Sequence, residues 1–357
     1  MDPPVRRSAY FINAPVDLLL IGGGSLIAYV GFRVFGASGG TYRSAQIAAL
    51  LVWICNWPHF SATSHRLYRS RATISQYPLT ALATPALMLC AVAAAFAWPL
   101  TAAPALVKLF LLWSPYHFSG QTLGIGLLYA RRSGFEIRPL ERRALAGFIF
   151  GTFAVQTARA ETGSSGSNFY GVWYPTLGLP GWVSSVLLVG MWACAALFVL
   201  QLAWRYRRER RIVPWIVVLP AVTQYVWFAA TPAGGFSVFV PFFHSLQYLL
   251  IAWAVNLKER LGEDARIPSR WFVWSASARW ALLNVCGGAV LFWVLPRVGA
   301  TAGANLAFST AVMLSAVQIH HFFVDGVIWK LKNPRVHSPL STSLAELSGR
   351  AAAPAVA

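Results

Sequence analysis

Long apolar runs separated by short polar connections constrain this chain more than any other feature of its sequence. A helix of about 20 apolar residues spans the hydrocarbon core of a bilayer, and runs of that length recur along the whole chain. We predict helices over residues 16–36, 44–64, 78–99, 104–129, 144–160, 180–204, 212–231, 236–257, 271–296 and 304–330. Charged residues make up only 11% of the 357 residues, against about 25% in soluble domains. The predicted fold class is therefore all-α, a polytopic transmembrane helical bundle of about ten spans.

The basic residues give the predicted topology. The formal net charge of +18 is typical of nucleic-acid-binding proteins, but here the charges lie in alternate connections of the bundle. These connections hold Arg66, Arg69 and Arg71; Arg131, Arg132, Arg138, Arg142 and Arg143; Arg205, Arg207, Arg208, Arg210 and Arg211; Lys258, Arg260, Arg266 and Arg270; and Lys330, Lys332 and Arg335. Lys and Arg concentrate on the cytoplasmic side of membrane proteins. We therefore expect both termini in the cytoplasm (N-in, C-in), no nucleic-acid partner, and a multi-pass protein of a bacterial inner (plasma) membrane.

The domain organisation follows from the same pattern. Residues 1–332 are expected to form a single transmembrane bundle, and residues 333–357, rich in Ala, Ser and Pro, a disordered cytoplasmic tail. The longest connection on the opposite side runs from Glu161 to Gly181, and we expect it to cap that face. The run Gly22-Gly23-Gly24 follows no predicted strand, so it indicates close helix packing rather than a nucleotide loop.

Six of the seven histidines lie in or at the ends of predicted spans, where an ionisable side chain is costly and indicates function. They are His59, His65, His117, His244, His320 and His321, whereas His337 falls in the tail. All six belong to even-numbered spans, which run in the same direction. Counted back from the basic end of each span, His59, His117, His244 and His320 lie at depths of roughly 10 to 21 Å. Their similar depth predicts one shared site; His65, close to a basic end, is expected at the membrane interface.

Short sequences around the histidines are alike. They read Pro58-His59-Phe60-Ser61, Tyr116-His117-Phe118-Ser119, Phe243-His244-Ser245 and His320-His321-Phe322. The likeness is consistent with duplication of a helix hairpin, with spans 2 and 4 in one half and spans 8 and 10 in the other.

Polar companions lie one helical turn from each histidine, on the same face. The amides are Asn56, Gln121, Gln247 and Gln318, and the other two companions are Tyr248 and Asp325. Metal-bound imidazoles usually donate their second N–H to an outer-shell acceptor, which is the role predicted for the amides. The amides are equally typical of hydrogen bonds between membrane helices. Tyr248 and Asp325 are the candidate catalytic residues, Asp325 as an orienting group or an additional ligand.

The predicted metal ligands are His59, His117, His244 and one of His320 and His321. Neighbours on a helix diverge by about 100°, so one member of the adjacent pair is expected to face elsewhere. Three or four imidazoles with one carboxylate suit a first-row transition metal, and open positions favour iron and oxygen chemistry. A proton or substrate pathway and unconnected core histidines are the other interpretations of the set.

A membrane bundle with single histidines on several spans resembles the Brp/Blh class of carotenoid-cleaving dioxygenases. The resemblance lies in the arrangement of His59, His117, His244 and His320, and it implies a four-histidine non-haem iron inside the bundle. Asp325 departs from that pattern. Membrane desaturases and hydroxylases are less similar, because their HxxxH and HxxHH boxes do not occur in this chain.

The expected function is that of a non-haem iron oxidoreductase, of the oxygenase, desaturase or hydroxylase type, that takes a lipophilic small molecule from the bilayer. Membrane lipids would surround it; the electron donor and the oligomeric state are left open. Aromatic residues predicted to line the substrate site are Trp57, Phe60, Tyr116, Phe118, Phe243 and Phe322, although aromatics in spans are also plain packing residues. The alternatives are a haem protein or electron carrier and a proton-coupled transporter with a His/Asp relay.

Overall fold

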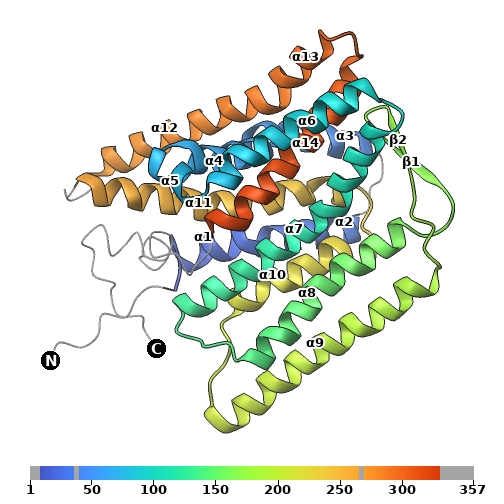
Figure 1. The fold of residues 1–357 in the computed structure, drawn as a ribbon. Helices are drawn as coiled ribbons and strands as arrows, with labels where there is room; N and C mark the ends of the chain where they lie inside the picture. The colour runs from blue at the N-terminus through green and yellow to red at the C-terminus, as the bar shows by residue number, and fades with distance from the viewer. Residues whose placement is uncertain (1–8, 36–39, 265–268, 330–357) are drawn as a thin grey trace.

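The chain forms a helical bundle with one small β-hairpin (Figure 1). The computed structural model describes residues 9–35, 40–264 and 269–329. Each of the ten predicted ranges coincides with a helical stretch, several of them built from consecutive segments. The segments are α1 (Ala14–Leu18), η1 (Leu19–Gly23) and α2 (Gly24–Phe35); α3 (Gly40–Leu51), η2 (Val52–Asn56) and α4 (Trp57–Tyr68); η3 (Leu79–Ala83) and α6 (Thr84–Ala97); α7 (Ala102–Arg132); α8 (Pro139–Ala160); α9 (Trp182–Glu209); α10 (Trp215–Phe228); η4 (Phe236–Phe239) and α11 (Val240–Asp264); α12 (Arg270–Ala289), η5 (Val290–Val294) and α13 (Leu295–Ala300); and α14 (Leu306–Ile328), with the short α5 (Arg71–Gln76) after α4.

Six of these stretches are long and apolar enough to cross a membrane. They are Ala14–Phe35, Leu79–Ala97, Trp182–Glu209, Phe236–Leu261, Arg270–Ala300 and Leu306–Ile328. Helix α10 is apolar but shorter. The protein is thus an all-α membrane protein apart from its hairpin, while the count of ten spans and the N-in, C-in topology stay predictions. The predicted tail at 333–357, with His337, lies outside the described residues.

Three helices contain a π-helical turn just before a proline. Pro58, Pro85 and Pro296 each lie two residues after the turns η2, η3 and η5. Proline lacks an N–H, and its ring clashes with the carbonyl four residues earlier in a regular helix. The extra residue of a π turn moves that carbonyl aside. Pro58 therefore shapes α4 directly beside His59.

The four histidine-bearing helices lie at the centre of the bundle. Helix α14 contacts α4, α6 and α7, and α4 also packs against α11 and α12. Figure 1 shows α8 and α9 as a hairpin along one side, with α12 and α13 along the opposite side. The centre of the bundle is thus enclosed by helices that carry none of the clustered histidines.

The connection from residue 161 to 181 folds over the start of α7. Strands β1 (Gly166–Phe169) and β2 (Val172–Pro175) pair in antiparallel register through a turn at Tyr170 and Gly171, both with positive φ, as a type I′ hairpin turn requires. Lys108 of α7 forms an ion pair with Glu161. The hairpin therefore covers one end of α7, in agreement with the predicted cap.

Glycines allow close packing of several helices. A Cβ on Gly22 would lie 2.3 Å from Thr223 Oγ1, so the packing interpretation is confirmed for this glycine of the run. A Cβ on Gly288 of α12 would lie 2.7 Å from the carbonyl carbon of Trp57. Helices α12 and α4 therefore pack closer together than a residue with a Cβ at position 288 would allow.

Replacement of Gly288 should destabilise the bundle. We expect Gly288→Ala to lower the free energy of unfolding by about 1–3 kcal/mol, because the methyl group forces α12 away from the α4 backbone. Thermal unfolding in detergent measures the change. Gly190→Ala in α9 is the matched control, because a Cβ there meets nothing within 4 Å. Equal melting temperatures for the two variants would contradict the proposed close contact.

Candidate metal centre

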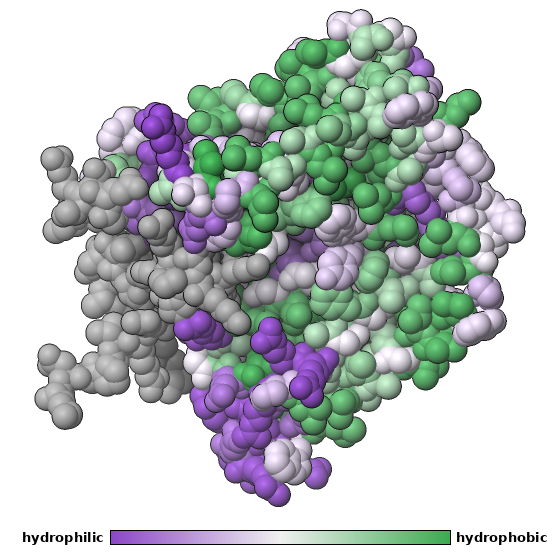
Figure 2. Space-filling model, in the orientation of Figure 1, coloured by the Kyte–Doolittle hydropathy of each residue, from purple (hydrophilic) through white to green (hydrophobic). Residues whose placement is uncertain are grey.

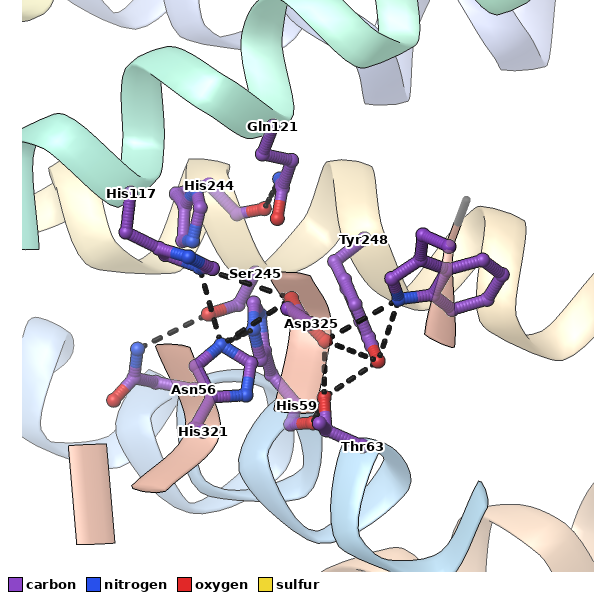
Figure 3. A network of polar contacts seen from close by, with 11 residues as sticks. Asn56, His59, Thr63, His117, Gln121, His244, Ser245, Tyr248, His321 and Asp325 are labelled. Atoms are coloured by element: carbon purple, nitrogen blue, oxygen red, sulfur yellow. Dashed lines mark hydrogen bonds and ion pairs between the residues drawn. The ribbon is translucent and has the colours of Figure 1, made fainter. Parts of the chain in front are cut away.

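Four polar side chains from three helices meet inside the bundle (Figure 3). They are His59 of α4, His117 of α7, and His321 and Asp325 of α14, and their ligand atoms all lie within 4.8 Å of one another. His59 and His321 are at most 2% exposed. The cluster therefore brings together residues that are up to 266 positions apart in sequence.

The three imidazoles point their Nε2 atoms at one another. His321 Nε2 lies 2.9 Å from His59 Nε2 and 3.1 Å from His117 Nε2. Asp325 Oδ2 lies 3.5 Å from His321 Nε2 and 3.8 Å from His117 Nε2. Three nitrogens and one carboxylate oxygen thus surround a common point.

A metal ion fits this arrangement better than hydrogen bonding alone. A ring nitrogen carries either one proton or one lone pair, so His321 Nε2 can take part in one hydrogen bond. Two nitrogens, those of His59 and His117, nevertheless lie within hydrogen-bond distance of it. A metal at about 2.0–2.1 Å from each nitrogen separates adjacent ligand atoms by roughly 2.8–3.4 Å, from octahedral to tetrahedral angles. The N···N distances of 2.9 and 3.1 Å lie within that range. The donor set present in the chain therefore suits a transition metal.

His244 lies beside the cluster. Its ring centroid is 5.1 Å from that of His59 and 5.4 Å from that of His117, and it stacks on Phe118 at 3.7 Å. Its Nδ1 is buried with no hydrogen-bond partner among the described residues. His244 is thus positioned next to the four converging groups without being one of them, and its role as a ligand stays a prediction.

The adjacent histidines of α14 separate as helix geometry requires. His321 faces the cluster, whereas His320 stacks on Tyr68 and its Nε2 lies 3.1 Å from the Tyr68 hydroxyl. The structure thus places His320 outside the candidate site. His65 is half-buried near the end of α4 and does not join the cluster of ligand atoms.

The two oxygens of Asp325 have different surroundings. Oδ1 accepts hydrogen bonds from Thr63 Oγ1 at 3.1 Å, Tyr248 Oη at 3.3 Å and Trp329 Nε1 at 3.3 Å. Thr63 Oγ1 and Tyr248 Oη lie 2.5 Å apart. These bonds fix the carboxylate so that Oδ2 faces His117 and His321. Tyr248 was predicted for the site; Thr63 and Trp329 were not, although each lies four residues after a cluster residue.

The amides predicted as outer-shell groups bind other partners. Asn56 donates to Ser245 Oγ at 3.0 Å, Gln121 donates to the carbonyl of His244 at 3.0 Å, and Gln247 donates to the carbonyl of Ile21. Each bond joins two helices, because a membrane interior offers no water to satisfy the amides. The interhelical interpretation therefore replaces the outer-shell one for these three residues.

Gln318 and the Nδ1 atoms of two histidines also lack the hydrogen bonds that the predicted outer shell requires. Gln318 is half-buried, with no hydrogen bond among the described residues. The Nδ1 atoms of His59 and His321 are buried without an acceptor in the described part of the chain. The described residues thus hold these two imidazoles by packing rather than by Nδ1 hydrogen bonds.

Five of the six predicted aromatic residues divide into two groups. Phe60, Phe118 and Phe322 pack on imidazoles, with ring centroids 4.7 Å from His321, 3.7 Å from His244 and 4.7 Å from His117. Trp57 instead stacks on Phe292, and Phe243 packs against Phe236 and Phe242. The first group encloses the cluster, while the second serves helix packing.

A cavity of about 360 Å³ adjoins the cluster between α7, α11 and α14. Its walls include the cluster residues His117 and Asp325, together with Tyr248 and the predicted Tyr116. The described residues that line it are Trp113, Tyr116, His117, Gly120, Gln121, Gly124, Ile125, Leu128, Tyr248, Ile251, Phe322, Asp325, Gly326 and Trp329. The volume is within the range of small-molecule sites, so the chain offers a donor set and an adjacent binding space.

The adjacent histidines of α14 supply a matched test of metal binding. We expect His59→Ala, His117→Ala and His321→Ala to lose the bound metal, since each removes a converging nitrogen, while His320→Ala keeps it. Mass spectrometry of the detergent-purified proteins measures metal per chain. Equal metal content in His320→Ala and His321→Ala would contradict the assignment.

The bonds to Asp325 Oδ1 supply a second test. We expect Tyr248→Phe and Thr63→Val each to keep the metal but weaken its binding about 10-fold or more, because the carboxylate loses a group that orients it. Competition with a chelator measures the affinity. Tyr68→Phe, at the hydroxyl that contacts His320, is the control and should leave the affinity unchanged; an unchanged affinity in all three variants would show that Asp325 is not a ligand.

Comparison with known proteins gives no relative. No protein-family model matches the chain, and no curated protein or solved structure is similar to it. The interpretation of the site therefore depends on the residues and their geometry.

Proposed function

We propose that the protein is a metal-dependent membrane oxidoreductase of the oxygenase, desaturase or hydroxylase type, with a non-haem iron at His59, His117, His321 and Asp325. The observation that carries the proposal is the convergence of three Nε2 atoms and one carboxylate oxygen on the wall of an apolar cavity. A lipophilic substrate in the cavity would lie directly against the metal ligands His117 and Asp325, which both line it.

The donor types favour iron over a structural zinc. Imidazoles with one carboxylate, and positions left open, are typical of non-haem iron oxygenases, whereas structural zinc sites are closed and rich in thiolates. The only buried cysteine of the described residues, Cys55, lies near the carbonyl of Phe242 and outside the ligand cluster. Iron bound here would supply oxygen activation, the chemistry that an unactivated hydrocarbon requires.

The protein residues around the cluster bind and orient. Trp113, Tyr116 and Phe322 form apolar walls for a substrate, and the burial of His59 and His321 excludes bulk water. Tyr248 and Thr63 hold their hydroxyl protons in the bonds around Asp325 Oδ1. The carboxylate is therefore oriented before substrate enters, and the site needs little rearrangement to bind metal.

The distances favour this proposal over a haem. Two axial imidazoles on opposite sides of a haem iron place their nitrogens about 4 Å apart, with the porphyrin between them, if each bond is about 2 Å. The pairs formed by His321 with His59 and His117 are separated by only 2.9 and 3.1 Å. These nitrogens fit adjacent positions on one metal, which leaves no room for a macrocycle.

The proposal keeps the resemblance to the Brp/Blh class in modified form. That class implies four histidines, and here His244 lies beside the cluster while Asp325 occupies a converging position. Residence in a bacterial inner membrane and reduction by a separate electron donor belong to the same proposal.

Oxygen-dependent conversion of a lipid tests the function. In membranes from cells that express the protein, we expect a neutral lipid to gain oxygen or lose two hydrogens under air and to stay unchanged under argon. Mass spectrometry of the lipid extract detects the change. The His117→Ala variant should give no product, and visible absorption of the purified protein should show no Soret band. Folded wild-type protein without bound metal would overturn the proposal.

A further inference from the structure

We infer that the cavity admits a slender, neutral molecule from the lipid phase through the gap between α7 and α14, and that Gly120, Gly124 and Gly326 set the width of that entrance. A reaction in the cavity rests on the proposed function, whereas binding of the molecule in the cavity does not.

The three glycines are not required for helix packing. A Cβ on Gly120, Gly124 or Gly326 would meet nothing within 4 Å, whereas one on the neighbouring Gly126 would lie 3.0 Å from the carbonyl of Val217. Glycine is unfavourable in a helix interior. A glycine that is not needed for close contact with another helix therefore has some other role. All three line the cavity, where any larger side chain would occupy the binding space.

The glycines lie on both sides of the gap. Gly120 and Gly124 are one turn apart on α7 and therefore lie on the same face, and Gly326 is on α14, which packs against α7. All three are exposed, and Tyr116 beside them is 50% exposed. In a membrane protein an exposed position between two apolar helices faces the acyl chains, so the entrance opens sideways into the bilayer. Figure 2 shows a recess in this face of the molecule, with hydrophobic atoms above and below it.

The shape of the cavity favours an elongated ligand. Its lining on α7 extends from Trp113 to Leu128, which is about 22 Å of helix at 1.5 Å per residue. His117 lies near one end of this stretch, and Ile125 and Leu128 lie toward the other. A chain-like molecule would thus place one portion beside the metal ligands while the rest extends along the glycine face.

The charge of the lining excludes an anionic head group as the favoured occupant. No Lys or Arg of the residues that the structure describes lines the cavity, and the carboxylate of Asp325 is part of its wall. A free carboxylate or phosphate would therefore lose its hydration without gaining a cationic partner, which is costly in an apolar site. Neutral molecules, such as hydrocarbons and long-chain alcohols, avoid this cost.

Photolabelling in vesicles tests the inference. The full chain in phosphatidylcholine vesicles is irradiated with hexadecanol that carries a diazirine and an alkyne, and the labelled peptides are mapped. We expect labels on the cavity-lining parts of α7 and α14. Gly124→Leu should lower that labelling at least about tenfold, since a side chain in an apolar pocket excludes a ligand that fitted before. Gly190→Leu, at an exposed α9 position where a Cβ meets nothing within 4 Å, should label like the wild type.

Three outcomes would overturn the inference: equal labelling of Gly124→Leu and wild type, labels confined to other helices, or equal labelling of the cavity by the matching diazirine hexadecanoic acid at a pH that keeps it ionised. Metal content is measured on the same samples. Cavity labelling in a metal-free wild type would refute the proposed function and leave the inference standing. Bound metal with no cavity labelling would refute the inference and leave the proposed metal site standing. Unchanged metal in Gly124→Leu shows that the variant still folds.

Discussion

The lack of water in an apolar bundle is the constraint on which this structure depends. A buried imidazole, amide or carboxylate must find its partner inside the protein, because the lipid supplies none. The polar groups of α4, α7, α11 and α14 accordingly face one another, and the four helices meet where these groups lie. Interhelical bonds such as those of Asn56 and Gln121 fix the helices above and below the cluster, so the polar residues determine how the apolar helices are arranged.

Sequence reasoning predicted the parts of the site that follow from helix periodicity and depth. The shared depth of His59, His117, His244 and His320 predicted one site, and the structure brings two of them, His59 and His117, together with His321. The one-turn spacing of His321 and Asp325 placed both on one face. It also required that one of His320 and His321 face elsewhere. It did not say which one, because that depends on the rotation of α14 against α4 and α7, and rotation is set by packing across the whole bundle.

The parts that sequence reasoning missed depend on contacts between helices. An amide one turn from a histidine bonds either to the imidazole or to the next helix, and Gln247 reaches Ile21 on a helix 226 positions earlier in the chain. Thr63 and Trp329 were overlooked because hydroxyl and indole groups are common in membrane helices, although both lie one turn from a cluster residue. The sequence alone does not distinguish the cavity glycines from packing glycines, because the difference is the empty space that a Cβ would meet.

The groups that orient Asp325 and the helix that forms the cavity wall are different. The hydrogen bonds to Oδ1 come from α4, α11 and Trp329 at the end of α14, and none of these three described bonds involves α7. Helix α7 contributes His117 to the cluster and forms one wall of the cavity. The orientation of Asp325 is thus set by α4, α11 and Trp329, whereas the position of α7 sets the place of His117 and the width of the gap to α14. The sequence places these two tasks on different helices, so a substitution on the cavity face of α7 need not alter the bonds that hold the carboxylate.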